Sequence, residues 1–210
     1  MLNRKLFFLT GCLFLLGIGV RAQAPVAQFT SNVTSGCAPL GVKFADQSTN
    51  SPTSWEWGFS NGQTSNLQNP VISFGTPGTY TVTLIVKNAS GADAIRDTNY
   101  ITVYASPTVS FGLNGQNLAC APVNIQFANY SQPGQGTITS YLWKFGDGAT
   151  SDDPTPSHLY TQTGYYNVGL TVTNSGGCSN SSTYIRVLRV VEGVQPNFTW
   201  SQTSTSCTAP

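Results

Sequence analysis

The residues that could perform chemistry are few in this 210-residue chain, and they gather around one short stretch. His158 is the only histidine, so serine-histidine or cysteine-histidine catalysis would have to use it. No nucleophile elbow accompanies this histidine. We therefore predict a structural role for His158, no enzymatic activity and no cofactor.

An acidic cluster precedes the histidine and consists of Asp147, Asp152 and Asp153. Because calcium takes carboxylate oxygens as ligands, these three residues are weak candidates for a calcium site. They fit no EF-hand loop, and aspartate in a Gly-Asp-Gly turn or before proline is ordinary turn chemistry. We therefore predict turns here and no metal site, and a glycosidase pair of carboxylates is less favoured still.

The stretch that leads into this cluster has the pattern of a β-strand followed by a tight turn. Tyr141, Trp143 and Phe145 occupy alternate positions, so the three aromatic side chains share one face of the strand. A face this apolar belongs in a core. The pattern of residues 141–148 recurs earlier in the chain, at residues 55–62, which indicates one β unit written twice.

Composition excludes several classes of function. Charged residues make up 8% of the chain and the net charge is +1, so there is no basic surface for nucleic acid. Serine, threonine, asparagine, glutamine and glycine dominate instead, and such a neutral polar coat is typical of an extracellular protein. The aromatic share of 11% and the repeated alternation argue against disorder.

The first 24 residues have the features of a targeting segment. Arg4 and Lys5 precede an apolar run over residues 6–20, and Ala22 and Ala24 provide the small residues of a signal-peptidase site. We predict a signal peptide over residues 1–24 and a secreted or cell-surface protein whose mature chain has no transmembrane segment. A lipid anchor at Cys12 is less favoured, because the apolar run continues beyond it.

Two repeats account for most of the mature chain, repeat 1 over residues 25–105 and repeat 2 over residues 106–193. Short alternating strands separated by Gly, Pro and Asn turns, without helical periodicity, predict an all-β fold of tandem antiparallel sandwiches with about seven strands each. Residues 100–103 and 184–187 are matched as the closing strands. Four aromatic residues are assigned to the core in preference to a sugar platform: Trp57, Trp143, Tyr80 and Tyr166.

A third repeat begins over residues 194–210. It matches the opening of the other two as far as Cys207, and one or two strands cannot bury their own face. We therefore expect further repeats or domains of the same protein beyond Pro210. Because the linkers at residues 105–107 and 192–196 are short, the units should follow one another end to end as a semi-stiff string.

Repeat 2 resembles the PKD domain, the polycystic-kidney-disease repeat. The matching segments are Trp143-Lys144-Phe145-Gly146-Asp147-Gly148, Ser151, residues 156–160 and residues 164–174. Repeat 1 is a weaker copy, in which Ile72 stands at the position of His158. The resemblance implies an immunoglobulin-like sandwich used as an extracellular spacer or adhesive module. The Cys-Ala-Pro openings resemble arrays in large surface proteins of gliding, type IX-secreting bacteria.

Cysteines of an exported chain are expected in disulfides. Cys120 opens repeat 2 and Cys178 follows its last long strand, so we predict that these two pair, with a stabilisation of roughly 4 kcal/mol. Repeat 1 has Ala92 at the position of Cys178, which leaves Cys37 without a partner in its own repeat. Cys207 likewise has no partner within its own partial repeat. A Cys37 to Cys207 bridge is disfavoured, because both ends of a two-domain rod would have to meet.

Three functions remain open. The first is a non-enzymatic structural or adhesion module of a larger surface protein, whose partner is an extracellular protein or polysaccharide. The second is an accessory spacer or substrate-binding region of a secreted hydrolase of the chitinase or protease type. The third is direct glycan binding by the repeats themselves, for which Tyr130, Tyr165 and Trp200 are the aromatic residues not assigned to the core.

Overall fold

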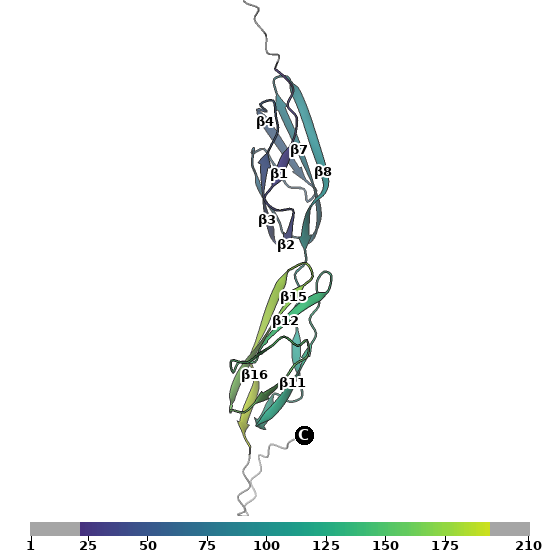
Figure 1. Ribbon diagram of the computed structural model, residues 1–210. Coiled ribbons are helices and arrows are strands. Elements are labelled where there is room, and N and C mark those ends of the chain that lie inside the picture. The colour runs from purple at the N-terminus through teal and green to yellow at the C-terminus, as the bar shows by residue number, and fades with distance from the viewer. Residues whose placement is uncertain (1–21, 194–210) are drawn as a thin grey trace, which may run out of the picture.

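A computed structural model of the chain describes residues 22–193 as two β-sandwiches arranged end to end (Figure 1). Residues 1–21 of the predicted signal peptide and the whole predicted third repeat, residues 194–210, lie outside the described residues. Every regular element between residues 22 and 193 is a strand. No helix in that range is long and apolar enough to cross a membrane.

Repeat 1 packs a three-stranded sheet, in the order β1-β3-β6, against a five-stranded sheet in the order β2-β8-β7-β4-β5. Its strands are β1 (Phe29–Ser31), β2 (Ser35–Cys37), β3 (Leu40–Asp46), β4 (Ser54–Phe59), β5 (Thr64–Ser65), β6 (Val71–Phe74), β7 (Gly78–Asn88) and β8 (Gly91–Tyr104). Alternation in β7 is strict, with every second residue from Tyr80 to Val86 buried. The residues between them, Thr81, Thr83 and Ile85, lie on the opposite face and are half-buried.

Repeat 2 has the same topology, with sheets in the orders β14-β11-β9 and β10-β16-β15-β12-β13. Its strands are β9 (Phe111–Asn114), β10 (Leu118–Ala121), β11 (Val123–Asn129), β12 (Ile138–Lys144), β13 (Thr150–Ser151), β14 (Ser157–Tyr160), β15 (Gly164–Asn174) and β16 (Ser179–Glu192). The fold is therefore all-β, with tandem immunoglobulin-like sandwiches of eight strands each. In each repeat one short strand pairs in parallel, β2 with β8 and β10 with β16.

Each sandwich has its own aromatic core. Trp57 and Trp143 are fully buried at equivalent places in β4 and β12, and Tyr80 and Tyr166 are also buried. The Trp57 indole N–H donates to the carbonyl of Leu67, and the Trp143 indole N–H donates to the carbonyl of Asp153, both at 2.9 Å. The four aromatic residues assigned to the core thus lie inside the two sandwiches, with their polar atoms satisfied.

The closing strands of the two repeats, β8 and β16, align with each other in a different register from the one predicted from the sequence. Tyr80 pairs with Ile101 in repeat 1, and Tyr166 pairs with Leu188 in repeat 2. Residues 100–103 therefore correspond to residues 187–190, and the match to residues 184–187 is wrong by three positions. A bulge interrupts both pairings just after the tyrosine, and the similar Tyr-Ile dipeptides hid this offset.

Candidate functional site: the junction between the repeats

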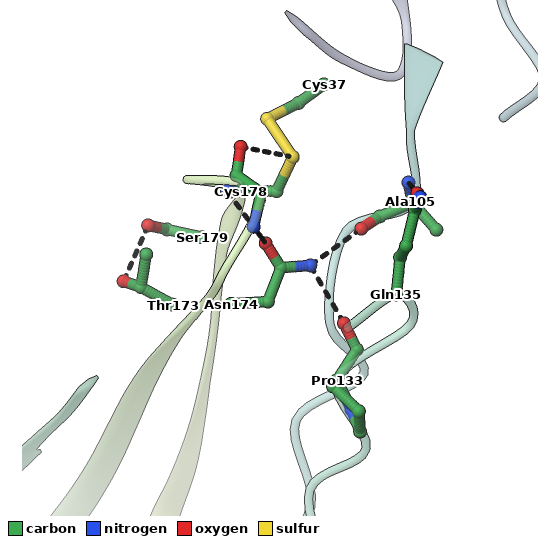
Figure 2. Close-up of a disulfide and its surroundings, with 9 residues drawn as sticks. Cys37, Ala105, Pro133, Gln135, Thr173, Asn174, Cys178 and Ser179 are labelled. Atoms are coloured by element: carbon green, nitrogen blue, oxygen red, sulfur yellow. Dashed lines mark hydrogen bonds between the residues drawn. A yellow bond between two sulfur atoms is a disulfide. The ribbon is translucent and has the colours of Figure 1, made fainter. Parts of the chain in front are cut away.

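A disulfide between Cys37 and Cys178 joins the two sandwiches (Figure 2). The Cα atoms are 5.6 Å apart. Cys37 ends β2 in repeat 1, and Cys178 lies in the turn between β15 and β16 of repeat 2. The prediction that Cys178 pairs with Cys120 is therefore wrong. Cys37, for which repeat 1 offered no partner, has one in the neighbouring repeat.

Strand length explains why Cys120 and Cys178 lie apart. Cys120 is the neighbour of Val191 near the end of β16, whereas Cys178 directly precedes Ser179 at the start of that strand. About a dozen residues at about 3.3 Å each place the two ends roughly 40 Å apart. A disulfide requires Cα atoms within about 7 Å. Cys120 is itself disulfide-bonded, and Cys207 lies outside the described residues.

A buried asparagine next to the disulfide holds the turn that contains Cys178. Asn174 ends β15 with 1% of its surface exposed. Its side-chain N–H groups donate to the carbonyls of Ala105 and Pro133, both at 2.8 Å, and its side-chain oxygen accepts from the backbone N–H groups of Gly176 and Cys178 (Figure 2). One amide thus uses all its hydrogen-bonding capacity to tie the linker, a loop and the cysteine turn together.

Glycines allow the backbone segments of the junction to approach closely. A Cβ added to Gly176 would lie 3.2 Å from the ring of Tyr104, the last residue of β8. Gly134 has φ +70°, and its own Cβ would meet the carbonyl oxygen of Ser106. The end of β8 and the linker are therefore both in contact with repeat 2, which differs from a free tether.

Sequence reasoning missed Asn174, although a signal for it was present. The equivalent turn of repeat 1 begins with Asn88, whose side-chain N–H groups donate to the carbonyls of Gln23 and Asn50, both at 2.8 Å. Its side-chain oxygen accepts from the N–H of Ser90. An asparagine at the same turn position in both repeats therefore anchors the segment that enters each sandwich.

His158 occupies a structural position in repeat 2. Its Nε2 lies 2.6 Å from a carboxylate oxygen of Asp147, and its ring stacks on Phe145 with centroids 4.2 Å apart. Partial burial alone would raise the pKa of Asp147, but hydrogen bonds from His158 and the N–H of Ala149 outweigh it and hold that pKa below its usual value. Ring and carboxylate thus stabilise the turn after β12.

Two of the three acidic residues considered for calcium, Asp147 and Asp153, make separate turn contacts. Asp147 bonds to His158 and to the N–H of Ala149, while Asp153 accepts from the N–H of Thr155. Over residues 22–193, no group of three or more acidic, histidine or cysteine residues, with Asp152 included, forms a cluster suited to a metal ion. Turn chemistry accounts for these contacts.

A family model described as "PKD domain" matches residues 22–103 and 104–188. The chain belongs to the PKD family. The two matches meet at the end of β8, next to the junction contacts.

Enzymes with PKD repeats are among the relatives. The pre-pro-metalloprotease PrtV of Vibrio cholerae is 34% identical over 96 residues, which cover 46% of this chain and 10% of PrtV. Collagenase ColA of Bacillus cereus is 39% identical over 71 residues, covering 33% of this chain and 7% of the collagenase. The chain thus spans about a tenth or less of these relatives.

A crystal structure of the PKD1 domain from the Vibrio cholerae metalloprotease PrtV is 34% identical to this chain. It covers 40% of this chain and 96% of the PKD1 domain, with a TM-score of 0.36. The sequence similarities concern the PKD repeats of this chain.

Proposed function

We propose that this chain is a non-enzymatic extracellular strut, in which the two PKD repeats hold a larger surface protein extended and keep a fixed mutual orientation. The observation that carries the proposal is the junction, where the Cys37–Cys178 disulfide and Asn174 connect repeat 1, the linker and repeat 2. A freely jointed spacer would need none of these contacts. The polar outer faces would then be presented to an extracellular protein or polysaccharide.

Chemistry also supports an extracellular location. Disulfides form and persist in oxidising compartments and are rare where thiols are kept reduced. Three cysteines between residues 22 and 193 are disulfide-bonded, Cys37, Cys120 and Cys178. The predicted signal peptide is in agreement with this environment.

Backbone NMR relaxation of the chain tests the strut directly. We expect the two repeats to share one rotational diffusion tensor while the Cys37–Cys178 disulfide is intact. In a Cys37→Ser/Cys178→Ser variant, the repeats should reorient more independently, while their chemical shifts away from the junction stay unchanged. Independent tumbling of the repeats in the disulfide-bonded chain would contradict the proposal.

The second candidate is an accessory region of a hydrolase, and the similarity to PrtV and ColA favours it. In that case these repeats would space or position a catalytic domain of the same protein. Native protein precipitated with antibodies against residues 22–193 would then hydrolyse gelatin or chitin, whereas the recombinant 210-residue chain would not. A precipitate without hydrolytic activity favours the surface strut.

A further inference from the structure

An exposed tyrosine on repeat 2 is surrounded by two arginines. Tyr165 is 51% exposed on β15, and its neighbour across the ladder is Arg189 of β16. The guanidinium carbon of Arg186 lies 4.0 Å from the centre of the tyrosine ring, and that of Arg189 lies 5.4 Å from it. Cation–π attraction thus holds both positive groups close to one exposed aromatic surface.

The charges of this cluster are not neutralised within the described residues. Across residues 22–193, the ion pairs are Lys87 with Glu56 and His158 with Asp147, and neither arginine takes part in one. The chain has only nine lysines and arginines in total, so two of them beside one ring is a concentration of charge. Two adjacent guanidinium groups that form no ion pair across this range are suited to an external anion, which would compete with Glu192 in the neighbouring depression.

The backbone at Arg186 has an unusual conformation. Its φ is 54°, in the left-handed region that L side chains other than asparagine and aspartate seldom adopt. The β16 bulge produces this conformation, and the Arg186 N–H donates to the side-chain oxygen of Asn167 at 2.7 Å. An arginine at a position that favours asparagine is a local cost, and such costs are commonly retained where a side chain has a function.

Repeat 1 provides an internal control because it has the same bulge without the cluster. Asn99 has φ 56° at the position of Arg186. Thr79 pairs with Thr102 where Tyr165 pairs with Arg189. The sandwich therefore forms with two threonines and an asparagine at these positions, so folding does not require the tyrosine and two arginines.

We propose that Tyr165, Arg186 and Arg189 form a binding site for an acidic polysaccharide, independently of the strut function. The carboxylate or sulfate groups of the polymer would bind the guanidinium groups, and a sugar ring would pack on the tyrosine. The site borders an open depression of about 390 Å³ lined in part by Thr163, Arg189 and Glu192. An open depression suits a hydrated polymer better than a buried small molecule.

Immobilised polysaccharides test this site with the full 210-residue chain. Polygalacturonate and dextran sulfate distinguish carboxylate from sulfate ligands, unmodified dextran is the neutral control, and polyglutamate is the acidic peptide control. Repeat 1 defines the substitutions: Tyr165→Thr, Arg186→Asn and Arg189→Thr. Lys144→Gln removes one positive charge from another part of repeat 2 and serves as the matched control.

We expect binding to at least one acidic polysaccharide and none to dextran. Each arginine substitution should weaken it by about tenfold, as expected for the loss of a hydrogen bond to a charged group, while Lys144→Gln leaves it within about twofold. Arg186→Asn should bind less while unfolding at the same or a higher temperature, because asparagine suits the backbone. Thr79→Tyr/Asn99→Arg/Thr102→Arg should strengthen binding.

Three results would overturn the proposal. The first is no retention of the wild-type chain on either acidic polysaccharide. The second is equal loss of binding with Lys144→Gln and with Arg186→Asn, which would indicate attraction by net charge. The third is equal or tighter binding to polyglutamate, which would assign the site to an acidic peptide.

Discussion

Repeat 1 and repeat 2 share one eight-strand sandwich but differ at three matched places. At the turn between the two longest strands, both have an anchoring asparagine, yet only repeat 2 has a cysteine, Cys178, bonded to its neighbour. After the tryptophan strand, repeat 1 has Ile72 where repeat 2 has His158 bonded to Asp147. At the bulge, repeat 1 has Asn99 where repeat 2 has Arg186.

These differences separate what the fold needs from what one repeat adds. Apart from Asn174, the buried strand positions carry hydrophobic residues in both repeats, whereas the histidine pair, the cysteine of the turn and the arginine of the bulge occur only in repeat 2. Repeat 1 shows that a sandwich forms without them. The additions of repeat 2 are therefore the places where substitutions should affect the junction, the turn or binding without abolishing the fold.

The largest expected effect is on the disulfide. Cys37→Ser/Cys178→Ser should destabilise repeat 2 by about 4 kcal/mol, because the crosslink restricts its unfolded chain through the folded neighbour. Hydrogen exchange read by mass spectrometry reports the two repeats separately. Each single serine variant should lose as much as the double variant, and unchanged exchange in β15 and β16 would contradict this prediction.

The two anchoring asparagines form a matched pair. Asn174→Ala should cost about 3 kcal/mol, since it removes a fully buried amide and leaves two backbone carbonyls and two N–H groups unsatisfied. Asn88→Ala should cost about 1 kcal/mol, because its turn is more exposed to water, which can replace the lost partners. Urea unfolding of each variant measures the difference. Equal losses of stability in the two variants would mean that burial of Asn174 at the junction with repeat 1 does not increase its contribution to stability.

A smaller effect is expected from crowding the junction. Gly176→Ala would place a methyl group against Tyr104 and should cost about 1 kcal/mol, by analogy with overpacking of a tight contact. Gly41→Ala in β3 is the control, because a Cβ there meets nothing within 4 Å. Thermal unfolding of both variants would test this, and a neutral Gly176→Ala would show that the tyrosine moves freely.

The smallest effect concerns pH. The pKa of Asp147 is lowered in the folded state, so its contribution is fully present above the unfolded value near pH 3.9 and is lost as the pH falls through the lower folded value. Because the pair with His158 is partly exposed, we expect it to contribute at most about 1 kcal/mol to the free energy of unfolding. Asp147→Asn, which copies Asn61 of repeat 1, should remove this part of the acid dependence.

A carboxylate in repeat 1 controls the pH experiment. Asp46 also has a lowered pKa, because hydrogen bonds from Ser48, Gln68 and Trp55 outweigh the opposing effect of burial. Asp46→Asn should therefore change the acid unfolding of repeat 1 and leave that of repeat 2 unaffected. Hydrogen exchange of both repeats, measured between pH 2 and pH 6, tests this. An effect of Asp46→Asn on repeat 2, or of Asp147→Asn on repeat 1, would contradict the assignment of each carboxylate to its own sandwich.

The sequence by itself determined the strands, the repeat and the core. Alternation with period two is a local property of a half-buried strand, so Tyr80, Val82 and Trp143 revealed their orientation without knowledge of any partner. Turn residues were equally local, which is why Asp147 and Asp153 were interpreted correctly as parts of turns. The recurrence of the unit then gave the number of sandwiches.

Only the tertiary structure decided which residues meet across the junction. Cys120 and Cys178 belong to one repeat, but β16 separates them by its full length, while the end-to-end arrangement brings Cys37 to Cys178. The offset of three positions in the closing strand likewise depends on a bulge in the pairing of β15 with β16. Strand register and the end of the sandwich at which a residue lies are set by non-local pairing, and composition and spacing carry little information about them.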